Sequence, residues 1–195
     1  MIAIIDYKMG NLRSVENALR RLGADFEVTA DAEKIRRADR VLLPGVGNCA
    51  EAVGNLRTAG LDRVIPSLRQ PVLGICVGLQ ALCLSSEEGD AEGLGIFDTR
   101  VRRFPQSATE KVPHVGWNSI ENLSSKLLRG IDSGTFVYYV HSYYAETCCD
   151  TIATTRHRLM FSAALKYENF YATQFHPEKS GDAGERILKN FLSLK

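Results

Sequence analysis

The chain has 195 residues, a length typical of one domain with a well-buried core. Hydrophobic residues make up 45% and charged residues 24%, and the formal net charge of +1 provides no field that would attract nucleic acid or an acidic membrane. No run of about 18 apolar residues predicts a transmembrane helix, and the first residues lack the basic stretch of a signal peptide. Five cysteines without CxxC spacing argue against a disulfide framework or a zinc knuckle and favour the reducing cytoplasm.

The first half of the chain alternates predicted strands and helices. In order, the expected elements are a strand at 2–6, a helix at 11–22, strands near 25–29 and 40–43 around a charged helical stretch, a glycine-rich loop at 44–47, helices at about 48–58 and 61–69, and a strand at 72–75. Strands that alternate with helices predict a parallel sheet with helices on both faces.

The second half reads mainly as strands joined by short polar turns. The expected strands are 94–103, 112–121, 134–140, 144–147, 150–156, 161–167 and 170–175, and a last helix covers about 180–193. We expect these strands to be largely antiparallel and to extend or flank the central sheet.

Cys76 lies within residues 74–80, which read GICVGLQ. An apolar run precedes it and a helical pattern follows, so the cysteine is expected on a sharp strand-to-helix turn that exposes its side chain. There the positive end of the helix dipole would favour the reactive thiolate. The same residues also allow an inert core cysteine, because a cysteine on an apolar strand is more often buried and unreactive.

Of the four histidines, His176 is best placed to serve as a base for this cysteine. It precedes Pro177 at the end of an apolar strand, and a residue before proline is held extended. In an extended segment residues two apart face the same side, so His176 and Glu178 would present imidazole and carboxylate together. Glu178 would then fix the tautomer that leaves the other nitrogen free for Cys76. The alternative is an ordinary ion pair in a surface turn.

Attack on an amide carbon develops negative charge on oxygen, which preorganised N–H donors stabilise. The backbone N–H of Val77, directly after the cysteine, is one candidate. The glycine-rich loop at 44–47 is a second, because ligands of parallel sheets bind at the carboxyl ends of the strands. The glycines are equally compatible with a plain tight turn.

Taken together, GICVGLQ, PGVGN at 44–48 and HPE at 176–178 resemble the class I (triad) glutamine amidotransferases. Two further segments, KVPHVGWN at 111–118 and GNLRSV at 10–15, resemble those of the glutaminase subunits of imidazole glycerol phosphate synthases. The resemblance implies a flavodoxin-like three-layer α/β sandwich, with a mostly parallel central sheet extended by antiparallel strands, in one amidotransferase domain over 1–195.

The resemblance also implies a role for each matching residue. Cys76 is the nucleophile, His176 the base and acid, and Glu178 its orienting partner. Seven positions are implied to contact glutamine or its oxyanion: Val46, Gly47, Val77, Gln80, Glu88, Ser142 and Tyr143. One departure is Lys8, which stands where the family commonly has glycine, on a loop directed toward the partner in family members, and it leaves details of docking open.

The implied reaction hydrolyses glutamine to glutamate and ammonia through a cysteine thioester, with no metal or organic cofactor. The ammonia would pass to a (β/α)8-barrel cyclase subunit in a heterodimer, which makes imidazole glycerol phosphate and an aminoimidazole carboxamide ribotide in histidine synthesis. No nucleic acid or membrane partner is expected. Seven residues are expected around the mouth of the site and against the cyclase: Asn11, Ser14, Lys111, Pro113, Trp117, Tyr138 and Lys179. For Trp117, plain core packing is an equal alternative.

Three other interpretations stay open on the sequence. A free-standing cysteine hydrolase would share Cys76 and His176 but would not require the 111–118 segment. A flavodoxin-like binding module with a redox-sensing cysteine would not need Glu178 beside His176. An amidotransferase that serves a different synthase is the third, and the 10–15 and 111–118 segments argue against it.

Overall fold

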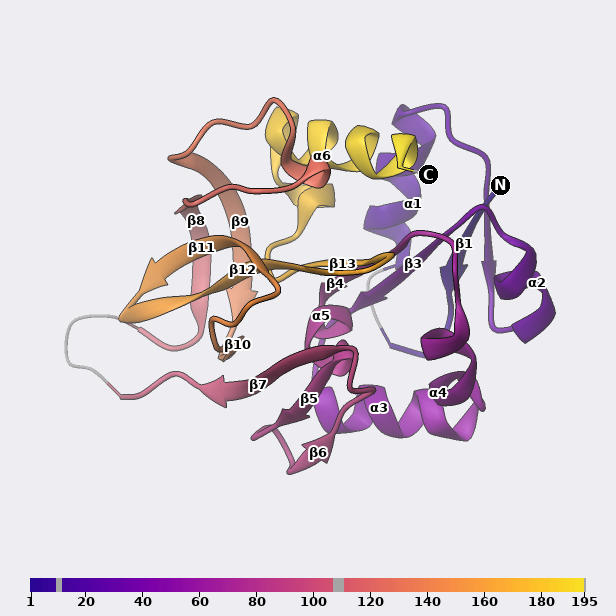
Figure 1. Cartoon of the computed structure of the whole chain (residues 1–195), viewed down its shortest axis with the longest axis horizontal. Coiled ribbons are helices and arrows are strands. Elements are labelled where there is room, and N and C mark those ends of the chain that lie inside the picture. Colours follow the sequence, from indigo (N-terminus) through magenta and orange to yellow (C-terminus); the bar gives the residue numbers. More distant parts are fainter. Residues whose placement is uncertain (10–11, 107–110, 195) are drawn as a thin grey trace.

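The computed structural model describes residues 1–9, 12–106 and 111–194. A seven-stranded sheet forms its centre, in the order β11-β12-β13-β4-β3-β1-β2 (Figure 1). The strands from β13 to β2 run parallel to one another, and β12 and β11 continue the sheet in antiparallel pairings. The strand bounds are β1 Ile2–Ile5, β2 Phe26–Thr29, β3 Arg40–Gly45, β4 Val72–Cys76, β11 Thr151–His157, β12 Leu159–Tyr167 and β13 Phe170–Thr173.

Two smaller sheets flank the central one. The first has the order β10-β7-β5-β6 and the second is the antiparallel pair β8–β9. Their bounds are β5 Cys83–Ser86, β6 Ala91–Glu92, β7 Phe97–Arg103, β8 His114–Ile120, β9 Thr135–His141 and β10 Tyr143–Ala145.

Helices cover both faces of the central sheet. Helices α1 and α6 lie on one side, and α3, α4 and α5 lie on the other (Figure 1). The helix bounds are α1 Leu12–Arg21, α2 Ala32–Arg37, α3 Cys49–Thr58, α4 Leu61–Val64, α5 Val77–Leu82 and α6 Gly181–Ser193, with 3-10 turns η1 Ile65–Ser67, η2 Lys126–Leu128 and η3 Pro177–Lys179. Among the residues described, no helix is both long and apolar enough to cross a membrane.

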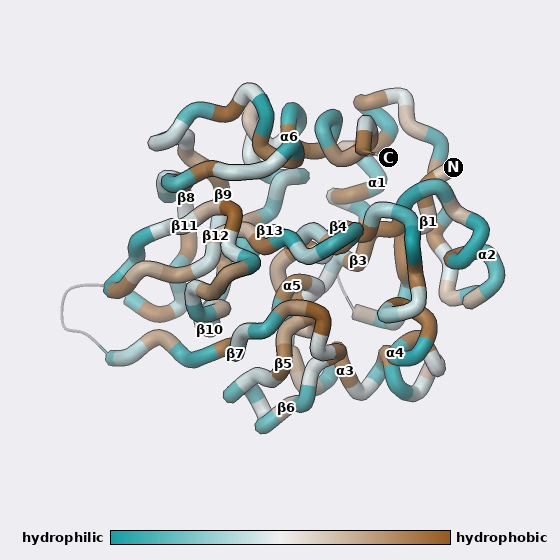
Figure 2. Tube along the Cα trace, in the orientation of Figure 1, coloured by the Kyte–Doolittle hydropathy of each residue, from teal (hydrophilic) through white to brown (hydrophobic). Residues whose placement is uncertain are grey.

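The central strands are apolar because helices bury both of their faces. Every residue of β1, β4 and β13 is buried. In Figure 2 the trace is brown, the hydrophobic end of the scale, along β1 and β3, whereas the edge helix α2 is mostly teal. The burial of continuous hydrophobic strands between two helical layers is the main force that holds the sheet in place.

The α/β architecture with a mostly parallel sheet extended by antiparallel strands confirms the predicted fold class. Several local expectations were wrong. The helix predicted to run to 69 breaks into α4 and η1, which has Pro66 in its first turn, and the chain leaves it at Leu68. The helix predicted after Cys76 is present, but it has only six residues, and the strand β5 that follows it was not among the expected strands. The strand at 170–175 is shorter, and it pairs antiparallel with β12 on one side but parallel with β4 on the other.

Candidate active site

Cys76 lies at the turn between β4 and α5, as the sequence predicted. Its backbone has φ 54° and ψ −106°, a combination that residues other than glycine rarely adopt. Such strain costs about 1–3 kcal/mol and persists only where the surrounding structure enforces it. Here Gly78 is part of that enforcement, because a Cβ at this position would overlap the carbonyl oxygen of Leu43 in β3. The glycine lets α5 approach the sheet closely and fixes the turn.

The parallel register brings the predicted segments to one end of the sheet. Gly45, the last residue of β3, pairs with Cys76 on one side of β4. On the other side Thr173, the last residue of β13, pairs with Ile75. The glycine-rich loop and the histidine segment therefore leave neighbouring strands beside the cysteine, since carboxyl ends of parallel strands share one sheet edge.

His176 and Glu178 form the pair that the sequence predicted. The Nδ1 atom of His176 is 2.8 Å from Glu178 Oε1, and both side chains are almost fully buried. The reason differs from the prediction: His176 is extended, but Glu178 lies in the 3-10 turn η3 rather than in an extended segment. The short turn after Pro177 still brings the carboxylate back to the ring.

The electrostatics of His176 favour the protonated imidazole. Burial alone would lower its pKa, but hydrogen bonding and charge from Cys76 and Glu178 outweigh burial and raise the pKa to about 10. Within the described residues, Nε2 is buried without a partner at hydrogen-bond geometry. A carboxylate thus holds the ring at Nδ1. Nε2 makes no other hydrogen bond among the described residues, and the Cys76 sulfur contributes to the raised pKa of the ring.

A cavity of about 220 Å³ opens above Cys76. All seven positions expected to contact glutamine or its oxyanion line it: Val46, Gly47, Val77, Gln80, Glu88, Ser142 and Tyr143. His176 and Glu178 do not line the cavity; they lie buried beside Cys76. The volume suits a small ligand.

Two of the lining side chains also make structural contacts. Glu88 Oε2 accepts the backbone N–H of Cys49 at 2.8 Å, at the first turn of α3. The Gln80 amide donates to the Tyr143 carbonyl at 3.2 Å and to Gln174 Oε1 at 3.2 Å. Both residues are therefore held in defined orientations at the cavity wall before any ligand binds.

Sequence reasoning missed three residues at the site: Val140, His141 and Gln174. Gln174 is fully buried and its amide donates to the Cys76 sulfur at 3.6 Å. A signal for it existed, because it lies two residues before His176 at the end of a strand, where alternate residues share a side. Val140 and His141 line the cavity from β9, and the Val140 carbonyl lies 3.9 Å from the sulfur. No sequence pattern indicated that β9 would lie against the turn at Cys76.

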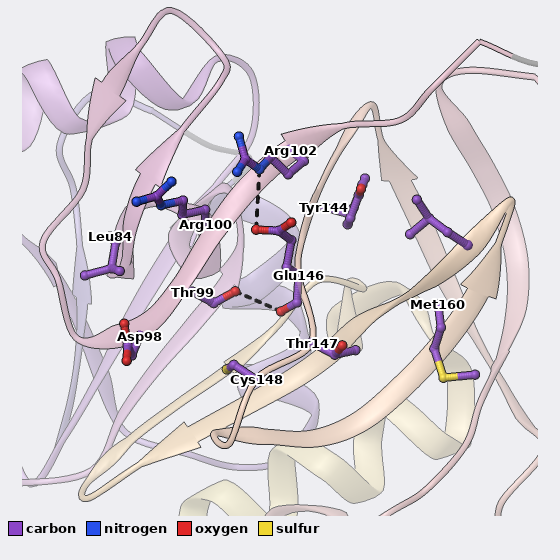
Figure 3. A pocket seen from close by; sticks show the side chains of 11 residues that line it. Leu84, Asp98, Thr99, Arg100, Arg102, Tyr144, Glu146, Thr147, Cys148 and Met160 are labelled. Atoms are coloured by element: carbon purple, nitrogen blue, oxygen red, sulfur yellow. Dashed lines mark hydrogen bonds and ion pairs between the residues drawn. The ribbon is translucent and has the colours of Figure 1, made fainter.

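A larger, open hollow of about 670 Å³ lies elsewhere, along β7 and the segment that follows β10 (Figure 3). It contains Arg100 and Arg102, and the latter pairs with Glu146 at 3.4 Å and Glu87 at 2.8 Å. Its one thiol, Cys148, has no histidine among the described residues that line the hollow. The smaller cavity, which contains the Cys76 turn, is therefore the candidate active site.

Residues expected at a partner interface cluster beside this cavity. Trp117 and Tyr138 are cross-strand partners on β8 and β9 with ring centroids 6.0 Å apart, and Lys179 Nζ lies 5.9 Å from the Tyr138 ring. Trp117 is 55% exposed, so core packing does not explain it. Pro113 lines the cavity and Lys111 is exposed.

The remaining positions linked to the expected interface are Ser14, Asn11 and Lys8. Ser14 is half-buried at the start of α1, and Asn11 lies outside the described residues. Lys8 is exposed and has φ 63°, a left-handed conformation that glycine adopts without strain. A glycine would adopt this conformation without the strain that a lysine incurs.

A strained cysteine, a carboxylate-held imidazole and a polar cavity lie together at the strand ends, an arrangement that suits hydrolysis by a cysteine. Residues 3–194 match the family description "Glutamine amidotransferase class-I". The chain therefore belongs to the class-I glutamine amidotransferase family.

Comparison with individual proteins points to one subunit type within this family. The chain is 55% identical over 194 residues to "Imidazole glycerol phosphate synthase subunit HisH" of Bacteroides fragilis (strain YCH46), and the match covers 99% of both chains. It is 45% identical to the HisH subunit of Archaeoglobus fulgidus over 100% of this chain and 98% of the relative. Among solved structures, a putative component of GMP synthase from Thermoplasma acidophilum superposes with a TM-score of 0.75 at 24% identity, over 98% of this chain and 91% of the other. The structural likeness supports the fold, and the sequence likeness extends over whole chains.

Proposed function

We propose that this chain is the glutaminase subunit of an imidazole glycerol phosphate synthase and that Cys76, His176 and Glu178 are its catalytic triad. The Cys76 thiolate attacks the side-chain amide carbon of glutamine, and His176 Nε2 protonates the departing ammonia, which leaves a γ-glutamyl thioester. His176 then takes a proton from water, whose oxygen attacks the thioester and releases glutamate. The balance is one glutamine and one water to one glutamate and one ammonia.

One observation carries the proposal: the imidazole that Glu178 holds at Nδ1 has its buried Nε2 unpartnered within the described residues, and Cys76 is a cause of its raised pKa. A thiolate beside an imidazolium is the activated form of a cysteine nucleophile. A redox sensor or an inert core thiol would not need the third, orienting carboxylate.

We propose that the seven cavity residues named above bind the substrate. The backbone at Val46 and Val77 faces the oxyanion, and Glu88 provides negative charge for the glutamine α-amino group. A carboxylate and backbone N–H donors in the lining of one small cavity suit an amino acid with a reactive side-chain amide.

We further propose that the exposed apolar face of β8 and β9 docks a (β/α)8-barrel cyclase subunit, to which the ammonia passes. This face, termed the β8–β9 patch, consists of Val115, Trp117, Phe136, Tyr138 and Val140. All but Tyr138 are large apolar side chains at least 37% exposed, and they share one side of the hairpin. Contiguous exposed apolar surface on a water-exposed sheet is typical of a protein interface.

Backbone hydrogen bonds connect the β8–β9 patch to His176 of the proposed triad. The His176 N–H donates to the Tyr138 carbonyl at 2.9 Å, and the Tyr138 N–H donates to Ser180 Oγ at 3.0 Å. The Ser180 hydroxyl in turn donates to the His176 carbonyl at 2.6 Å. A subunit that docks on β9 thus contacts a strand that holds the backbone of the catalytic histidine. We place the complex in the cytoplasm, where the five cysteines, all free thiols, would stay reduced.

The decisive experiment uses Cys76→Ala together with the cyclase subunit. We expect glutamine-dependent synthesis to be lost, because no thioester can form, whereas synthesis from added ammonium stays within about twofold of wild type. Cys149→Ala, which removes an exposed free thiol, is the matched control and should retain both activities. Loss of ammonia-dependent synthesis in Cys76→Ala, or persistence of the glutamine-dependent reaction, would contradict the assignment.

A further inference from the structure

Three of the four histidines form a cluster that the proposed chemistry does not use; two of them are buried and His157 is half-buried. His114 and His141 are cross-strand partners on β8 and β9, and each is 6% exposed. His157, the last residue of β11, stacks on His114 with ring centroids 4.1 Å apart. His141 also lines the active-site cavity. The cluster therefore lies directly behind the wall of the site.

The partners of His141 fix its tautomer. Nδ1 lies 2.7 Å from the Tyr143 carbonyl oxygen, which can only accept, so Nδ1 carries the proton. Burial, together with the neighbouring imidazoles, lowers the pKa of His141 to about 3 against the opposing effect of the Tyr143 hydrogen bond. The ring is neutral near pH 7, and its Nε2 carries no proton and can only accept a hydrogen bond.

The tautomer of His114 follows from that of His141. His114 Nδ1 is 3.0 Å from His141 Nε2 and must donate to it. Burial and the charge of His157 lower the pKa of His114 to about 4, so its Nε2 accepts, and the Asn118 amide donates to it at 3.2 Å. The Asn118 amide cannot be reversed, because its oxygen accepts the Ser119 N–H at 2.8 Å and its nitrogen also donates to the Arg156 carbonyl at 3.0 Å.

At the other end the chain of hydrogen bonds reaches the nucleophile. The Tyr143 carbonyl that accepts from His141 also accepts from the Gln80 amide. Gln80 Nε2 donates its second proton to Gln174 Oε1, which leaves the Gln174 nitrogen to donate to the Cys76 sulfur. Every donor and acceptor from β8 to the sulfur has one allowed role.

We propose that His141 is a positioning residue for glutamine hydrolysis: its Nδ1–H holds the Tyr143 carbonyl, and through it the 142–143 backbone at the cavity wall and the Gln80–Gln174 amide bridge to Cys76. The proposal rests on the glutaminase function proposed above. His114 and Asn118 keep His141 in the required tautomer. This series of hydrogen bonds orients groups but conducts no proton. It ends on a carbonyl oxygen and two amides, which do not exchange protons with their neighbours during turnover.

The first test is direct observation of the tautomers by nitrogen-15 NMR of the full chain near pH 7. We expect His114 and His141 to be neutral with the proton on Nδ1. His157 differs, because its Nε2 lies 3.1 Å from the Lys111 carbonyl and must carry a proton. His176 should be doubly protonated, in line with its pKa of about 10. A proton on Nε2 of His141 would overturn the proposal whatever the catalytic activity.

The second test compares three variants. His141→Leu removes the donor to Tyr143 and should raise the KM for glutamine about five- to tenfold, the effect of one lost hydrogen bond. His141→Asn places an amide N–H near the position of Nδ1 and should recover most of that loss. His157→Leu removes the stacked ring but none of the hydrogen bonds that connect His114 to Cys76, and its KM should stay within about twofold of wild type.

The outcomes separate the two proposals. Equal loss in His141→Leu and His141→Asn, or equal loss in His157→Leu, would reduce the cluster to a packing element and overturn the positioning role. Thermal unfolding of each variant identifies loss of fold, and in that case the NMR tautomers of the wild-type chain decide. If the wild-type chain neither hydrolyses glutamine nor reacts at Cys76 with the glutamine analogue 6-diazo-5-oxo-norleucine, the glutaminase function itself fails.

Discussion

At the scale of single residues, the site depends on two local costs that the surrounding fold offsets. Cys76 adopts a positive φ that a cysteine avoids in isolation. His176 is buried, which opposes its charged form, yet Cys76 and Glu178 raise its pKa to about 10. The strained turn presents the sulfur to the cavity, and the buried carboxylate holds the proton on the imidazole. Both features suit the proposed reaction, and the raised pKa of His176 also makes a pH-dependent contribution to stability.

The raised pKa of His176 makes a prediction about stability. A histidine whose folded-state pKa lies above its ordinary value of about 6.5 stabilises the fold fully below that pH and loses this contribution as the pH rises through about 10. Relative to His176→Asn, the wild-type free energy of unfolding should fall by on the order of 4 kcal/mol between pH 6.5 and 10. Urea unfolding at several pH values measures the difference.

Comparison with the same variant cancels the groups that titrate in this range without contacting His176. Glu178→Gln should give a shallower fall, because it removes one of the two groups that retain the proton on His176. A wild-type advantage that stays constant from pH 6.5 to 10 would show that the imidazole has no raised pKa.

At the scale of elements, the site exists because three neighbouring strands end at the same edge of the sheet. The β3 loop, the β4–α5 turn and the segment after β13 converge through parallel pairing. Helix α5 has only six residues, so its position is set by contact with the sheet rather than by its own helical stability. That contact is closest at Gly78 and Gly74, where an added Cβ would overlap or crowd backbone atoms.

Gly78→Ala tests this packing. The methyl group would meet the Leu43 carbonyl, and because a backbone atom cannot move aside cheaply, we expect a loss of about 1–3 kcal/mol in the free energy of unfolding. Gly54→Ala, on the exposed face of α3 with no heavy atom near the added methyl, is the control and should gain about 0.5–1 kcal/mol. Urea unfolding compares them, and equal effects of the two substitutions would refute close packing as the reason for Gly78.

At the scale of the whole molecule, the small β8–β9 sheet joins the site to the surface. Its β9 strand contributes Val140 and His141 to the cavity wall, and one face of the sheet presents apolar side chains to solvent. Tyr138 and Ser180 connect this sheet to His176 through hydrogen bonds to its backbone. The arrangement suits a chain whose activity is linked to a docked partner.

Trp117→Ala tests the β8–β9 patch. Trp117 is 55% exposed, so its removal should change the free energy of unfolding by less than about 0.5 kcal/mol. If it anchors the interface, the affinity for the cyclase subunit should fall about 30-fold or more, as for a central aromatic contact. Titration calorimetry with the cyclase measures the affinity. Met160→Ala, which removes a 48% exposed apolar side chain of β12 outside the patch, should bind like wild type, and a Trp117→Ala affinity equal to it would remove this residue from the interface.

The sequence by itself determined the α/β class, the strand-to-helix turn at Cys76 and the pairing of His176 with Glu178. These rest on local chemistry: apolar runs, a helix pattern after a glycine-flanked cysteine, and a proline that holds the preceding His176 extended. The sequence also indicated the loop at 44–47 as a neighbour of the cysteine, because strand ends in a parallel sheet share one edge.

Only the tertiary structure decided the rest, because it depends on contacts between residues far apart in the chain. The early end of α5 at Leu82 and the parallel pairing of β13 follow from packing that no local pattern encodes. Gln174 reaches the sulfur of Cys76 across a separation of 98 residues, and His141 meets His114 across 27. Hydrogen bonds across such separations form only when the folded sheets bring the strands together, so the network behind Cys76 is a property of the fold.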